Sequence, residues 1–418
     1  MNINPFLLYG YNGPEYFCDR VEETKYILSA LRNGRNITLL SPRRMGKTGL
    51  IYHIFNAIQK DEKDAACFYI DIFPTKSLDD FVHNLGTAVV GKLDSFGKKA
   101  AKTALSLFKS FKVVLSTDPV SGNPQPSIEF APQETKNTLA EIFAYLKQSK
   151  QECYIAIDEF QQIAEYKDEG VEALLRSYIQ FCPNVHFIFS GSKQHLMTEM
   201  FGSVSHPFYR STEIFNLTAI SEDHYYAFAK KWMSKNSIKL SKEIFSELYH
   251  KFDGHTWYMQ RVLNRLYETA LATIEIADVE LCIAAIVESE KEIYQRLIAL
   301  LTRNQCQLLI AIAKEGCANA INSSAFVQRY HLKNASSIKT KNGVTKIVMT
   351  MFLVFIKALA ILIQSHYSTL QSFQIQRHKT VINDVALLSF HHEFLRQKHI
   401  NGTANTANIF QVILLHKG

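Results

Sequence analysis

The stretch "NITLLSPRRMGKTGLIYHIF", residues 36–55, decides the fold of this 418-residue chain. A basic loop joins its short apolar run to a second run whose apolar residues have helical spacing. Gly46, Lys47 and Thr48 fit the end of the phosphate-loop pattern G-x-x-x-x-G-K-[ST]. Ser41 stands at the first position, where the pattern has glycine, so we expect an ordinary φ or a modest strain there.

In the strand–loop–helix context of this motif, backbone N–H groups surround phosphate groups at the start of the helix. Lys47 is then expected to reach the β- and γ-phosphate oxygens, and the Thr48 hydroxyl to bind Mg²⁺. The alternative is a chance G-K-T in a basic loop. The predicted nucleotide-binding residues of the loop are Ser41, Pro42, Arg43, Arg44, Met45, Gly46, Lys47, Thr48 and Gly49.

An acidic pair ends a second apolar run, "CYIAIDEFQQIAEY", residues 153–166. Asp158, at the tip of the strand expected beside the loop, can hold the Mg²⁺ shell. Glu159 can orient and deprotonate an attacking water. Either acid alone could simply cap the next helix, but the two together with G-K-T favour a nucleotide site.

Two further segments contribute candidate catalytic residues. Ser190 and Ser192 end a predicted strand in "HFIFSGSKQHLM", and a hydroxyl there could lie near the γ-phosphate or the water. A simple turn explains the same serines equally well. Arg210, in "SHPFYRSTEIF", could reach the γ-phosphate of a neighbouring subunit or could be a surface arginine.

The apolar runs predict an α/β fold with a parallel sheet, because buried parallel strands are apolar throughout and alternate with helices. The predicted strands lie at 36–40, 67–73, 153–158, 186–192 and 213–217. We therefore expect an α/β domain that carries the phosphate loop over residues 1–218. An exposed loop is expected at 116–132, where prolines, Gly122 and small polar residues gather.

Strand signals end near residue 218. Residues 219–300 show amphipathic helical spacing and predict a helical domain. Residues 301–340 have the helix, break and helix pattern of a helix-turn-helix or of the start of a winged helix. The tail, 341–418, is atypical. Its apolar run, 347–363, is marginal for a membrane span of roughly 20 residues, so a buried helix or an aberrant tail is expected.

Composition narrows the class of protein. A net charge of +7 and a pI near 8.8 are compatible with a polyanionic partner, but an ordinary basic surface is the simpler interpretation. The seven cysteines include no C-x-x-C pair, which argues against a zinc site or a disulfide framework. The first residues lack the pattern of a secretory signal, and we expect a cytoplasmic protein.

Residues 5–340 resemble the archaeal-type ATPases, in the STAND branch of the AAA+ proteins and related to origin-recognition ATPases. The resemblance is carried by "EYFCDRVEE", "LLSPRRMGKTGL", "YIAIDEFQQI", "FIFSGSKQHLM", "HPFYR" and "FDGHTWYMQRVLNRLY". It makes Ser41 an accepted variant, since the family carries S-P-R-R or G-P-R-R. It implies ATP and Mg²⁺ as ligands, and it places Tyr16, Phe17 and Arg20 against the adenine, with aromatic stacking as a mechanism.

Two features depart from the family pattern. STAND lids carry G-x-P, whereas this chain has Gly254-His255-Thr256. The winged-helix pattern stops at Lys339, and we hypothesise that residues after about 340 come from a shifted reading frame or a rearranged gene end.

The leading interpretation is an ATP-binding, Mg²⁺-dependent and slow ATPase that acts as a molecular switch. The alternative is a DNA-binding regulator with nucleotide in a structural role. A DNA or protein partner at the winged helix and a homo-oligomer are expected, and a membrane is not. The polar residues of the helix-turn-helix segment are Arg329, His331, Lys333 and Lys339. A fused nuclease finds no support, because the tail has no convincing D…E-x-K constellation.

Overall fold

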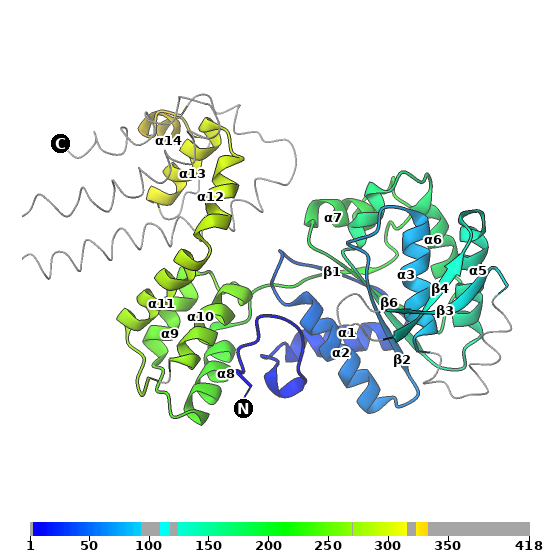
Figure 1. Ribbon diagram of the computed structural model, residues 1–418, viewed down its shortest axis with the longest axis horizontal. Helices are drawn as coiled ribbons and strands as arrows, with labels where there is room; N and C mark the ends of the chain where they lie inside the picture. The colour runs from blue at the N-terminus through cyan, green and yellow to red at the C-terminus, as the bar shows by residue number, and fades with distance from the viewer. Residues whose placement is uncertain (1–2, 93–108, 118–123, 270, 316–322, 333–418) are drawn as a thin grey trace, which may run out of the picture.

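The computed structural model describes residues 3–92, 109–117, 124–269, 271–315 and 323–332. Within them a sheet domain is followed by a helical domain and then by two further helices (Figure 1). The expectations for the tail, including its apolar run, fall outside the described residues. No helix in the described part of the chain combines the length and apolarity that a membrane crossing requires.

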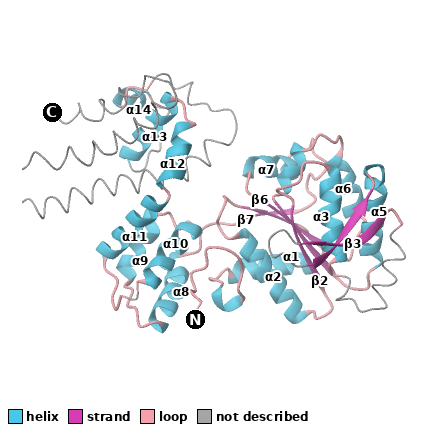
Figure 2. Ribbon diagram, in the orientation of Figure 1, coloured by secondary structure: helices cyan, strands magenta, loops and turns pink. Residues whose placement is uncertain are grey.

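A five-stranded parallel sheet forms the centre of the first domain (Figure 2). Its strands, in spatial order, are β2 (Ala66–Asp71), β5 (Cys153–Asp158), β6 (Val185–Gly191), β1 (Ile37–Leu40) and β7 (Glu213–Asn216). Every residue of β1, β5 and β6 is buried, which is why these strands are apolar without alternation. The α/β fold with a parallel sheet, predicted from the sequence, is confirmed.

Helices cover both faces of the sheet (Figure 1). One face packs on α1 (Val21–Arg32) and α2 (Lys47–Asp61), in a cluster that includes Tyr154 and Ala156 of β5. Ile155, between them in the strand, lies in the cluster on the other face, because successive side chains of a strand point to opposite sides. The helices of that face are α3 (Leu78–Val90), α5 (Thr135–Gln148), α6 (Val171–Ile179) and α7 (Gln194–Gly202).

A hairpin corrects the expectation of an exposed loop at 116–132. β3 (Phe111–Thr117) pairs antiparallel with β4 (Pro124–Phe130), so much of that segment is strand, while 118–123 lie outside the described residues. Ile128 of β4 is fully buried and packs so closely on α3 that a Cβ on Gly86 would lie 2.3 Å from it. Burial and strand pairing outweigh the local turn signals, and prolines are tolerated in such an edge hairpin.

The helical domain consists of α8 (Glu222–Lys235), α9 (Lys242–Lys251), α10 (Thr256–Glu268) and α11 (Ile276–Ser289), and α12 (Lys291–Ala299) leads from it to the helices that follow (Figure 1). Ser221 and Ser241 begin α8 and α9 by accepting hydrogen bonds from backbone N–H groups of the first turn. Phe6, from the N-terminal segment, is fully buried in the core of this domain. Two helices follow, α13 (Arg303–Glu315) and α14 (Ser324–Arg329).

Candidate functional site

The loop between β1 and α2 ends in a glycine that its geometry requires. Gly46 is the N-cap of α2 and has φ of 93°, a conformation that side-chain-bearing residues rarely adopt. Ser41 is fully buried and is not among the residues with positive φ. The first position of this loop therefore does not need glycine.

Lys47 is buried at the first turn of α2, with 7% of its surface exposed. Its Nζ donates to the backbone oxygens of Ser41 and Pro42, at 3.2 and 3.3 Å. Burial lowers the pKa of Lys47, and the charges of Asp158 and Glu159 act in the opposite direction. The backbone of the loop thus holds the ammonium group, close enough to Asp158 and Glu159 for their negative charges to favour its protonated form.

Asp158, at the end of β5, is 5% exposed and accepts three hydrogen bonds. Thr48 Oγ1 and the hydroxyl of Tyr69 both donate to Oδ2, at 3.0 and 2.7 Å. The backbone N–H of Glu159 donates to Oδ1 at 3.0 Å. Asp158 thus lies beside the end of the loop, as expected, although β6 separates β5 from the loop strand β1 in the sheet. The contact still forms because α2 starts at the edge of the sheet where all these strands end.

Glu159 has φ of 55° and caps the short helix η4 (Phe160–Glu165). Its Oε2 accepts a hydrogen bond from Ser192 Oγ at 2.7 Å and another from the side-chain amide of Gln161. Ser192 thus lies beside the acidic pair. Ser190 is fully buried, and its hydroxyl has no hydrogen-bond partner within the described residues.

Phe17 lies against the beginning of α2. Its ring stacks on His53 with 4.3 Å between ring centroids, and a Cβ on Gly49 would lie 3.4 Å from it. The hydroxyl of Tyr11 and Nδ1 of His53 share a further hydrogen bond of 3.0 Å. Phe17 is therefore close to the loop, as expected for a residue near a bound base.

Tyr16 and Arg20 have different neighbours. The ring of Tyr16 stacks on Trp232 of α8, with centroids 5.1 Å apart. Arg20 is 3% exposed and donates to Glu23 and to the backbone oxygen of Thr218, both at 2.7 Å. These side chains tie the N-terminal segment to the lid and to the end of the sheet domain.

Arg210 lies in the turn before β7, with φ of 52° and an exposed side chain. Its guanidinium lies 5.2 Å from the centroid of the Tyr209 ring. No interaction among the described residues links it to Lys47 or to Asp158. Its expected role toward a neighbouring subunit stays a prediction.

The lid contacts two of the predicted loop residues, Arg44 and Met45, through side chains whose role the sequence did not indicate. The guanidinium of Arg44 lies 4.2 Å from the ring centroid of Trp257 in α10, and that of Arg261 lies 4.9 Å from it. Thr256 Oγ1 donates to the backbone oxygen of Met45 at 3.4 Å. Tyr69 and Gln161 were likewise missed, because no local pattern marks a side chain that acts across strands or turns.

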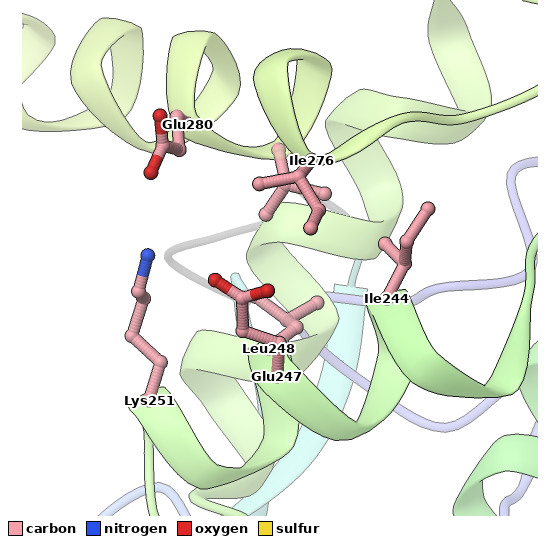
Figure 3. A pocket seen from close by; sticks show the side chains of 7 residues that line it. Ile244, Glu247, Leu248, Lys251, Ile276 and Glu280 are labelled. Atoms are coloured by element: carbon pink, nitrogen blue, oxygen red, sulfur yellow. The ribbon is translucent and has the colours of Figure 1, made fainter. Parts of the chain in front are cut away.

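A separate pocket lies in the helical domain between α9 and α11 (Figure 3). It contains no residue of the loop or of β5. Its lining residues are Ile244, Glu247, Leu248, Lys251, Ile276, Val279 and Glu280.

Comparisons with protein families find two matches. The family described as "ATPase domain predominantly from Archaea" matches residues 17–262. The family described as "Probable winged helix domain" matches residues 292–350, which extends past residue 340. A search of curated proteins finds no match.

Solved structures share the fold. The Walker-type ATPase PABY2304 of Pyrococcus abyssi is 17% identical with a TM-score of 0.57, over 85% of this chain and 99% of that chain. The ORC2 protein of Aeropyrum pernix, solved as ADPNP–ADP complexes, is 16% identical with a TM-score of 0.51, over 85% and 90%. The family match confirms a winged-helix region after the helical domain, but over 292–350, so the expectation that its pattern stops at Lys339 is wrong. Because the ATPase-domain model matches more than half of its length, this chain belongs to the archaeal-type ATPases of the AAA+ class.

Proposed function

We propose that this protein binds ATP with Mg²⁺ at the loop, hydrolyses it slowly and acts as a nucleotide-dependent switch. The observation that carries the proposal is the 3.0 Å contact between Thr48 Oγ1 and Asp158 Oδ2, next to the buried ammonium of Lys47. A hydroxyl and a carboxylate are hard oxygen donors, and Mg²⁺ commonly takes only one or two protein groups besides phosphate oxygens. The residues therefore fit the ion: Thr48 and Asp158 would hold it, and it would supply positive charge beside the phosphate groups.

Other residues of the chain bind the phosphates and activate the water. Lys47 offers a positive charge to the β- and γ-phosphate oxygens, and the amides at the start of α2 add further donors. Glu159 is the base. Ser192 and Gln161 occupy its Oε2, which orients the carboxylate and leaves Oε1 to accept the proton of the attacking water.

Two substitutions test this proposal. Lys47→Ala should abolish nucleotide binding, since it removes the charge that faces the phosphates, whereas Lys60→Ala, at an exposed position of the same helix, should not.

Glu159→Gln should bind ATP but release phosphate about 10²- to 10⁴-fold more slowly. Glu152→Gln, just before the other end of β5, is its control.

The measurements are binding of a fluorescent ATP analogue and release of phosphate. Unchanged ATP binding by Lys47→Ala would contradict the site. Full hydrolysis by Glu159→Gln would require another base.

The switch role is supported by the direct contact between the loop and α10, which can transmit a change at the phosphates to the lid. Membership of the STAND branch, a cytoplasmic location and a homo-oligomer that uses Arg210 belong to the same proposal.

A DNA-binding regulator is the second candidate, and the winged-helix match favours it. Of the residues expected to contact DNA, Arg329 and His331 lie in or next to α14, while Lys333 and Lys339 lie outside the described residues. Salt-dependent DNA binding that persists in Lys47→Ala would support this function, and DNA binding lost with the nucleotide would favour the switch.

A further inference from the structure

Tyr69 contacts Asp158 of the candidate site from the strand next to β5. It lies on β2 and pairs with Ala156 of β5, while Asp71, two residues on, pairs with Asp158. Its hydroxyl donates to Oδ2 of Asp158 at 2.7 Å, which is the oxygen that also accepts from Thr48. One carboxylate oxygen thus receives a hydrogen bond from α2 and another from β2.

These contacts determine the orientation of the carboxylate. A carboxylate has about four acceptor positions, and Asp158 uses three of them within the protein. The ring of Tyr69 packs on that of Tyr52, with centroids 4.9 Å apart, so the hydroxyl itself is held in place. Loss of this donor would leave Oδ2 with the hydrogen bond from Thr48 alone, so the orientation of the carboxylate would be less tightly fixed.

We propose that Tyr69 is a positioning residue of the magnesium site, which fixes the carboxylate of Asp158 in the orientation that the metal shell requires. This inference rests on the proposed binding of ATP with Mg²⁺. Groups that hold a metal-site residue through hydrogen bonds act on affinity without touching the ion, and their loss typically weakens metal binding by 10- to 100-fold.

The test measures how nucleotide affinity depends on Mg²⁺, with a fluorescent ATP analogue and the full-length protein. Tyr69→Phe should raise the Mg²⁺ concentration that gives half of the metal-dependent gain in affinity by roughly tenfold. The substitution keeps the ring and leaves Asp158 two donors, so the protein is expected to fold. Binding in EDTA provides the reference, because a purely structural defect would weaken binding with and without metal alike.

Tyr154→Phe is the matched control. It removes another tyrosine–carboxylate hydrogen bond, to Glu62 at 3.0 Å, from the opposite end of β5. We expect it to leave the Mg²⁺ dependence unchanged. Its effect on the thermal unfolding midpoint shows what the loss of such a bond costs in stability alone.

A double-mutant cycle shows whether Tyr69 acts through Asp158. In an Asp158→Asn background, Tyr69→Phe should change the Mg²⁺ dependence no further, and an additive effect would overturn the inference. A wild-type Mg²⁺ dependence in Tyr69→Phe would also overturn it, and would leave the proposed function intact. Failure of the wild-type protein to bind nucleotide would instead reject the proposed function.

Discussion

Two positions of the loop, 41 and 46, differ in whether the backbone needs a positive φ angle there. Gly46 has φ of 93°, whereas Ser41, at the position where the motif usually has glycine, is not among the residues with positive φ. The departure of Ser41 from the motif therefore costs the loop no backbone strain. Its buried position instead lets its oxygens accept from Lys47.

Gly46→Ala should lower the free energy of unfolding by about 1–2 kcal/mol, because a Cβ is disfavoured at positive φ. No atom lies within 4 Å of the added Cβ, so the cost is in the backbone alone. Relief of that strain would displace the loop amides, and ATP affinity should fall by roughly fivefold or more. Denaturant unfolding and nucleotide titration measure the two effects.

Ser41→Gly is the control for that variant. It removes the 3.4 Å hydrogen bond from Lys47 to the Ser41 hydroxyl and the 3.0 Å bond from that hydroxyl to the oxygen of Pro42, but Lys47 keeps the backbone oxygens of Ser41 and Pro42. Its ATP affinity should therefore remain within about twofold of wild type. A large gain in affinity from Ser41→Gly would show that serine strains the loop after all.

Among the elements, α10 is the one that joins the lid to the phosphate loop. Trp257 is 8% exposed and lies close to the guanidinium groups of both Arg44 and Arg261. Such contacts contribute about 0.5–2 kcal/mol each. In this chain they connect loop and lid next to Gly254-His255-Thr256, where the family motif G-x-P is missing.

Trp257→Leu should weaken this connection. In the wild type we expect ATP to slow hydrogen exchange at the amides of α10, since an ordered loop orders the lid that it contacts. The substitution should reduce that protection by up to about tenfold, as expected for a lost interaction of about 1–1.4 kcal/mol.

Trp232→Leu serves as the comparison, because Trp232 is buried in the same domain but contacts Tyr16 and Lys235 instead of the loop. Equal loss of protection in the two variants would mean that the effect comes from a loosened lid core.

For the whole molecule, we expect a second copy of the chain to contribute Arg210 to the nucleotide site. Arg210 is exposed in the turn before β7, and no described interaction connects it to the loop of its own chain. An arginine that reaches a phosphate from a neighbouring subunit can accelerate transfer by 10³-fold or more.

Mixing two inactive variants tests this role. Lys47→Ala retains Arg210, and Arg210→Ala retains the loop, so hydrolysis should reappear when they are combined if each site uses residues of two chains. Lys47→Ala mixed with Glu159→Gln should stay inactive, because both defects lie in the same half of the site. Recovery in the second mixture, or full activity of Arg210→Ala alone, would contradict the arrangement.

Much of the fold was predictable because its signals are local. Buried parallel strands are apolar along their whole length, the acidic pair stands at the end of one such strand, and the G-K-T follows another after a five-residue loop. The hairpin β3–β4 was missed because its stability comes from pairing and from the packing of Ile128 on α3, which no local pattern records.

Local chemistry in the sequence was therefore sufficient to identify the sheet, the helical domain and the loop residues Lys47 and Thr48. Only the tertiary structure decided that the hydroxyl of Tyr69 donates to Asp158 and that the guanidinium of Arg44 lies over the ring of Trp257. The burial of Phe6 in the core of the lid is likewise a tertiary contact. The physical reason is distance along the chain. These contacts join residues from separate elements, and their geometry exists only once the core has packed.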